Sequence, residues 1–101
     1  MPRTYTSADN QIVAKDGESF VIELQGNATT GYEWELEFDT GMIKGVGQEY
    51  KPGGEGIGAG GRERFTLKAL KAGETVIRAL YKRPWEREAI EEKKFKVRIQ
   101  K

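Results

Sequence analysis

Two adjacent threonines, Thr29 and Thr30, carry the hydroxyl groups that come nearest to a reactive arrangement in this sequence. They lie between Asn27 and Gly31, two residues that favour turns because they tolerate left-handed backbone geometry. A nucleophilic threonine needs a nearby base, and a chain without histidine or cysteine offers only lysines and carboxylates for that role. The other interpretation is that the hydroxyls cap the backbone of their own loop. We therefore expect no catalysis by this pair and no cofactor.

Three glutamates follow this loop at every second position, and closely spaced carboxylates can serve acid–base chemistry or bind a cation. The spacing also matches a half-buried β-strand, whose side chains point to alternate faces. The two faces are Glu33, Glu35 and Glu37 on one side and Tyr32, Trp34, Leu36 and Phe38 on the other. A solvent-exposed strand face is the simpler explanation of the glutamates, so no metal site is predicted. The threonine loop is thus joined to a strand whose aromatic face anchors it in a core.

A glycine-rich segment, residues 56–61, formally matches the dinucleotide-binding pattern G-x-G-x-x-G. Such a site needs a strand before the motif and a helix after it, whereas a charged, alternating segment follows here. Two other interpretations remain open. The segment is either a flexible linker or a loop whose backbone lies flat against a partner, since missing Cβ atoms permit close approach. In the second case Ile57 is its only apolar contact.

The third unusual segment contains Arg83, Pro84 and Trp85. A tryptophan beside a turn proline is often part of the core, but this one is surrounded by charged residues. Proline stiffens the loop by fixing its own φ, and tryptophan and arginine dominate the energetics of binding interfaces. We therefore favour an interface anchor over a core residue.

The rest of the chain predicts an all-β protein: an antiparallel β-sandwich of about seven short strands. The expected strands are residues 11–14, 19–25, 32–38, 42–50, 62–70, 75–81 and 94–100. Gly45 and Gly47 suggest a bulge or an edge position in the fourth of these strands. Residues 86–94 are rich in helix formers, so a short helix before the last strand is an alternative. We expect one domain over residues 1–101, with residues 1–9 loosely ordered.

The connections between these strands fall into two groups. Short turns contain Gly17, Gly41 and Gly73, whereas residues 27–31, 51–61 and 82–92 form longer connections of unusual composition. If successive strands run in opposite directions, alternate connections lie at the same end of the sandwich. The three long connections would then share one end, which is typical of a binding module.

Composition excludes several partners. The chain has Lys+Arg 17 and Asp+Glu 16, a net charge of +1, which gives no electrostatic reason to expect nucleic acid or an anionic membrane. No apolar run approaches a membrane span, and the first residues lack the apolar stretch of a secretory signal. We expect a monomer that is cytoplasmic, or exported with its signal absent from this chain.

At the three long connections the sequence resembles the chagasin family, whose members inhibit papain-like cysteine peptidases. The family carries the motifs N-P-T-T-G-aromatic-x-W, G-x-G-G and R-P-W, in this order, on three loops. The matching residues here are 27–34, 58–61 and 83–85, and the resemblance extends from about Gln11 to Ile99. Ala28 replaces the proline of the first motif, so ordering that loop costs about 0.5–1 kcal/mol more.

The resemblance implies an immunoglobulin-like sandwich that acts as a reversible, non-covalent inhibitor by placing three loops in the active-site cleft of a papain-like cysteine peptidase. Thr29 would meet the catalytic groups, the glycine loop would lie along the non-primed side, and Trp85 would pack on the opposite rim. The implied peptidase-binding residues are Asn27, Ala28, Thr29, Thr30, Gly31, Ile57, Gly58, Ala59, Gly60, Gly61, Arg83, Pro84 and Trp85. The rival interpretation is an immunoglobulin-like adhesion or carbohydrate-binding module that uses the same loops.

Overall fold

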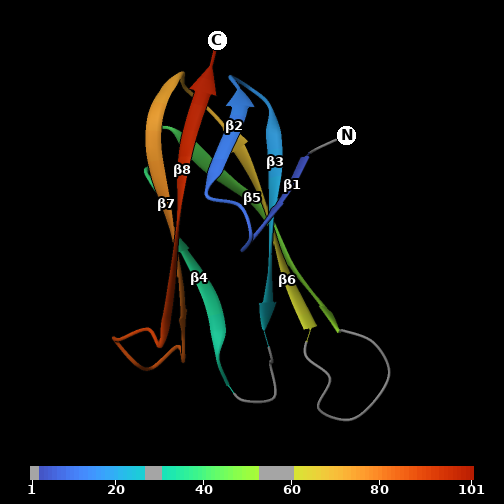
Figure 1. Cartoon of the computed structure of the whole chain (residues 1–101), viewed down its shortest axis with the longest axis vertical. Coiled ribbons are helices and arrows are strands. Elements are labelled where there is room, and N and C mark those ends of the chain that lie inside the picture. Colours follow the sequence, from blue (N-terminus) through green and yellow to red (C-terminus); the bar gives the residue numbers. More distant parts are fainter. Residues whose placement is uncertain (1–2, 27–30, 53–60) are drawn as a thin grey trace.

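The computed structural model describes residues 3–26, 31–52 and 61–101, and these form eight β-strands (Figure 1). The strands are β1 (Arg3–Thr6), β2 (Gln11–Lys15), β3 (Ser19–Gly26), β4 (Glu33–Glu37), β5 (Ile43–Pro52), β6 (Gly61–Ala69), β7 (Gly73–Lys82) and β8 (Glu91–Gln100). Within these ranges, no helix has the length and apolar character needed to span a membrane. The all-β prediction is confirmed.

The strands make two four-stranded sheets, in the orders β1-β3-β6-β5 and β2-β8-β7-β4. Four of the neighbouring pairs are antiparallel, while β1–β3 and β2–β8 are parallel. The antiparallel sandwich predicted from the sequence did not include these two parallel pairs. Because the chain reverses direction at each connection, two odd-numbered or two even-numbered strands run the same way, and they pair in parallel wherever they become neighbours.

The N-terminal segment corrects one prediction. We expected residues 1–9 to be loosely ordered, but Arg3–Thr6 form β1, which pairs with β3. Tyr5 is buried, and its hydroxyl donates to the carbonyl of Val13 at 2.9 Å and accepts from the Val13 amide at 3.3 Å. This side chain therefore ties β1 in one sheet to β2 in the other. This strand was hard to predict, since Tyr5 is its only apolar residue.

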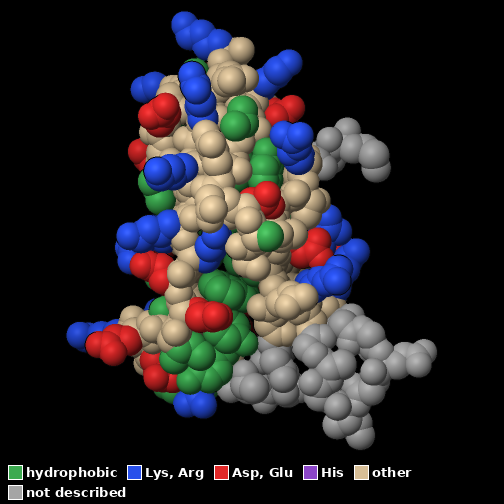
Figure 2. Space-filling view, in the orientation of Figure 1, with side chains coloured by type: hydrophobic (Ala, Val, Ile, Leu, Met, Phe, Trp, Pro, Cys, Tyr) green, Lys and Arg blue, Asp and Glu red, His purple; other side chains and the backbone are tan. Residues whose placement is uncertain are grey.

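The core lies between the sheets and is built from the alternating residues that the sequence pattern indicated. Phe20, Ile22 and Leu24 of β3 face Phe95 and other apolar residues of β7 and β8, and all of them are buried. The side of the molecule seen in Figure 2 carries lysine, arginine and acidic side chains in mixture. Removal of this apolar surface from water is the main stabilising term for such a sandwich.

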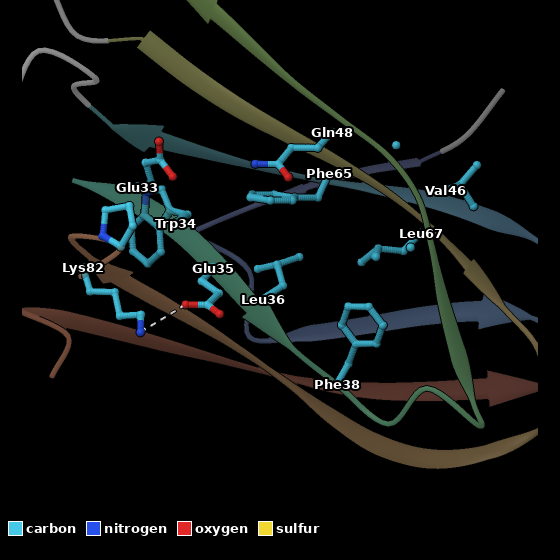
Figure 3. Close-up of a pocket in the computed structure, with 13 residues that line it drawn as sticks. Glu33, Trp34, Glu35, Leu36, Phe38, Val46, Gln48, Phe65, Leu67 and Lys82 are labelled. Carbon is cyan, nitrogen blue, oxygen red and sulfur yellow. Dashed lines mark ion pairs between the residues drawn. The ribbon is translucent and has the colours of Figure 1, made fainter. Parts of the chain in front are cut away.

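The weak fourth strand of the prediction is β5, and both of its expected features are confirmed. It lies at the edge of its sheet, and its register with β6 shifts between Gly45 and Gly47. Between this edge and β4, the edge of the other sheet, runs an open groove of about 690 Å³ (Figure 3). Leu36 of β4 and Phe38, which follows β4, line it and are only half-buried for that reason.

The predicted separation of the connections is also confirmed for the residues that the structure describes. At one end, the Gly17 amide donates to the Ala69 carbonyl and the Leu70 amide to the Met42 carbonyl, which joins the three short turns. The long connections start and finish at the other end. The alternative helix over residues 86–94 is wrong, because residues 91–94 already pair with β7 as part of β8.

Candidate functional site

The predicted peptidase-binding residues divide into two groups. The structure describes Gly31, Gly61, Arg83, Pro84 and Trp85. The others lie outside the described residues, so their predicted roles stay predictions: Asn27, Ala28, Thr29, Thr30, Ile57, Gly58, Ala59 and Gly60.

The residues that flank the three long connections meet at one end of the sandwich. In one sheet, Gly26 at the end of β3 pairs with Gly61, and Gly61 pairs with Pro52. In the other sheet, Glu33 pairs with Lys82, and the preceding residue of β7 pairs with the first residue of β8. Register alone therefore brings the ends of all three connections to one edge of the molecule (Figure 1).

Trp85 is the most prominent apolar side chain at this end. It is 73% exposed, whereas the chain's other tryptophan, Trp34, is 7% exposed and belongs to the core. Trp85 is therefore not a core residue, and its predicted role as an interface anchor stays a prediction. A Cβ atom built on Gly31 would lie 3.5 Å from Cη2 of Trp85, so the third connection packs against the end of the first.

A stack of aromatic rings leads from the core to this exposed tryptophan. The ring of Trp34 lies 4.8 Å from that of Tyr81, and Tyr81 stacks on Tyr32 with ring centroids 5.4 Å apart. The guanidinium carbon of Arg83 lies 4.7 Å from the Tyr32 ring centroid and 5.9 Å from that of Trp85. Tyr81 was missed as a member of the site, since in sequence it is one more apolar residue of β7.

Polar contacts within residues 82–86 hold the loop that carries Trp85. The Glu86 amide donates to the Arg83 carbonyl at 3.0 Å, which closes a turn around Pro84. The Lys82 ammonium donates to the Glu86 carbonyl at 3.1 Å and pairs with Glu35 of β4 at 3.3 Å. Arg83 also lies 3.5 Å from the Glu86 carboxylate. The backbone that presents Trp85 is therefore fixed by its own chain.

Beneath this surface lies Glu63, the one charged side chain that is buried among the described residues. Its carboxylate accepts the Trp34 amide at 2.8 Å, so it connects β6 of one sheet to β4 of the other. Burial raises the pKa of Glu63, against the lowering effect of this hydrogen bond, and the charge of nearby Glu33 adds to the rise. The sequence pattern of β6 indicates this burial, because Glu63 lies two residues before the inward-facing Phe65 and therefore points to the same face of the sheet.

The two described glycines of the predicted site have distinct physical roles. Gly31 has φ +84, a conformation that residues with a side chain rarely adopt. Gly61 is buried under Tyr50, and a Cβ there would overlap the phenol ring and lie 2.7 Å from the Lys51 carbonyl. Gly61 is therefore required by packing at the base of the glycine-rich connection.

With this geometry established, comparison with known proteins identifies the family. The model of the "Chagasin family peptidase inhibitor I42" matches residues 13–99, which is most of the chain. The chain belongs to the chagasin family of peptidase inhibitors. The resemblance noted in the sequence is thereby confirmed, and the proteins of this family are inhibitors, not enzymes.

Individual chagasin-family proteins agree with this assignment. Amoebiasin-1 of Entamoeba histolytica is 32% identical over 88 residues, which cover 84% of each chain. Chagasin of Trypanosoma cruzi is 31% identical over 87 residues, covering 80% of this chain and 79% of chagasin. Among solved structures, the cysteine protease inhibitor EhICP2 from Entamoeba histolytica superposes with a TM-score of 0.83 at 25% identity, covering 97% of this chain and 96% of EhICP2.

The chemistry of the site in this chagasin-family chain fits a binding surface. Among the described residues, no group of three or more acidic side chains is placed to hold a metal ion. What the surface offers is an exposed tryptophan on a fixed backbone, an arginine beside it and backbone free of side-chain bulk at Gly31. Such features give shape and contact area, which are what a protein–protein interface needs.

Proposed function

We propose that this chain is a reversible, non-covalent inhibitor of papain-like cysteine peptidases that blocks the active-site cleft with the three connections at one end of its sandwich. The single observation that supports this most strongly is the convergence of Gly31, Gly61 and Trp85 at that end. It allows three segments far apart in sequence to enter one groove together. Family membership and the likeness to a cysteine protease inhibitor support the class of target.

The rigidity of the site supports inhibition by blockage of the active-site cleft. A loop that must become ordered on binding loses affinity through its conformational entropy. In this chain the segment around Trp85 is already fixed by the Lys82 and Arg83 contacts, and Gly31 packs against the tryptophan ring. The inhibitor therefore needs little rearrangement at this part of its surface when it binds.

Each of the three connections has its own proposed role in the complex. Trp85, with Pro84, provides apolar contact area at one rim of the cleft, while Ile57 and the backbone of residues 58–61 contact the other side. Thr29 reaches the catalytic cysteine and histidine of the peptidase, and Thr30 shapes the loop beside it. No bond is made or broken by the inhibitor, so a chain without histidine or cysteine is sufficient for this role.

Titration of papain with the purified chain tests the proposal. We expect stoichiometric, competitive loss of peptidase activity that recovers on dilution, and mass spectrometry should recover intact chain after long incubation. Absence of inhibition would overturn the proposed target class. Stoichiometric cleavage within residues 27–31 would show that the first connection binds as a substrate.

A further inference from the structure

Arg83 occupies an unusual position between Tyr32, which follows the first connection, and Trp85 in the third connection. Its guanidinium group lies over the ring of Tyr32, which begins the segment after the first connection, and near the ring of Trp85 in the third. Among the described residues it also pairs with Glu86, 3.5 Å away in the same loop. These three contacts of the cation all lie within the inhibitor itself.

We propose that Arg83 is a positioning residue, which joins Tyr32 to Trp85 so that the third connection meets the peptidase in a fixed orientation relative to β4 and the residues just before it. The proposal rests on the proposed function. It extends that function by distinguishing the residue that contacts the peptidase from the residue that orients this contact. Trp85 is the contact. Arg83 holds the orientation of Trp85, and Tyr32 is the platform against which Arg83 is held.

The platform is itself supported from the core. Tyr32 stacks on Tyr81, and Tyr81 packs on the buried ring of Trp34. The indole nitrogen of Trp34 donates to the Gln25 carbonyl at 2.8 Å, immediately before the first connection. A continuous series of contacts thus runs from β3 through β4 and β7 to the exposed tryptophan.

The same series touches both flanks of the first connection. A Cβ built on Gly26 would lie 3.4 Å from the Tyr81 ring and 3.6 Å from Trp34, and one built on Gly31 would lie 3.5 Å from Trp85. A change in the stack therefore reaches the residue before and the residue after residues 27–30. This geometry is what makes Arg83 more than a surface charge near the interface.

Arginine suits this role because its planar guanidinium stacks on aromatic faces. Each exposed cation–π contact corresponds to roughly a two- to fivefold change in an equilibrium constant, so losing both predicts roughly a five- to thirtyfold change. We expect Arg83→Gln to raise the inhibition constant for papain by about this factor. Tyr32→Leu should act in the same direction, although it leaves the charge of Arg83 in place.

The first experiment needs no peptidase. The sequence contains Trp 2, so labelling with 5-fluorotryptophan gives one fluorine resonance for Trp34 and one for Trp85, assigned with Trp85→Phe. Arg83→Gln and Tyr32→Leu should lower the transverse relaxation rate of the Trp85 resonance, because the released indole moves faster. The matched control is Arg98→Gln, a change on the outward face of β8 toward the opposite end, which should leave both resonances unchanged.

The second experiment is a double-mutant cycle on inhibition of papain. If Arg83 acts through Trp85, then Trp85→Ala weakens inhibition less in the Arg83→Gln background than in the unchanged chain. Independent, multiplying effects together with an unchanged Trp85 resonance would show that Arg83 contacts the peptidase directly, which overturns the proposal. An unmodified chain that fails to inhibit papain would refute the proposed function alone, since the fluorine measurement does not depend on it.

Discussion

Replacement of Trp85 by alanine separates binding from folding more cleanly than any other single change in this chain. A tryptophan side chain presents roughly 200 Å² of surface, and 73% of Trp85 is exposed, so roughly 150 Å² remains for a partner to cover. At about 25 cal/mol per Å² this area corresponds to an upper limit of about 4 kcal/mol of binding free energy. We therefore expect Trp85→Ala to raise the inhibition constant at least about tenfold and up to several hundredfold.

The same substitution should hardly affect the fold. Trp85 lies outside the core, and among the described residues it packs near Gly31 and Arg83. We expect the free energy of unfolding, measured with urea, to fall by less than about 1 kcal/mol, whereas Trp34→Ala should lower it by about 3–5 kcal/mol. Val76→Ala, a change at an exposed residue on the outward face of β7, is the matched control for both assays.

The opposite pattern would rule out the proposed role of Trp85 as a binding contact. An unchanged inhibition constant together with a loss of several kcal/mol in unfolding free energy would mean that Trp85 supports the fold and does not contact the peptidase. Inhibition constants from progress curves with papain, combined with urea unfolding of the same samples, distinguish the two outcomes.

Three further predictions concern residues around the site. Gly61→Ala should lower the unfolding free energy by about 1–3 kcal/mol in urea unfolding because its methyl group overlaps Tyr50 and lies too close to the Lys51 carbonyl; Tyr50→Ala should reduce this loss by removing the overlap with the ring, and an undiminished loss would contradict the packing of Gly61 against Tyr50. Because the folded state raises the pKa of Glu63, its stabilising contribution is present below the ordinary glutamate pKa and is lost as pH rises through the raised value. Glu63→Gln should therefore flatten the rise in stability toward acid pH, and an unchanged pH profile by thermal unfolding would argue against the assignment. Ala28→Pro, which restores the family motif, should tighten inhibition of papain roughly two- to fivefold by restricting the unbound loop, and weaker inhibition would show that proline is not tolerated there.

Much of the fold could be predicted because period-two alternation is explicit in β3, β4, β6 and β8. Phe95 and its neighbours in β8 show it clearly, with every second residue buried. β1 was missed since a four-residue strand with one apolar side chain has almost no periodic signal. Its place depends on a long-range contact, the hydroxyl of Tyr5 with Val13, that sequence spacing does not reveal.

The site was predicted less completely than the fold, for a physical reason. Trp85 and Arg83 stood out because their residue types are unusual for a loop, and the structure places both at the expected end. The residues that support them from the core could not be recognised in the sequence. Tyr81 and Glu63 sit in ordinary strand positions, and their roles arise only when β6, β7 and β4 come together. Thr29 and the other residues outside the described ranges remain predictions from the family motif.

Hydrogen exchange of the chain, free and bound to papain, reports which end of the sandwich meets the peptidase. We expect slower exchange in the complex for peptides that cover residues 26–34, 50–62 and 82–90. Peptides covering the short turns around residues 17, 41 and 72 should exchange at the same rate in both states. Protection confined to those turns, or to the groove between β4 and β5, would contradict the claim that three connections at one end form the inhibitory surface.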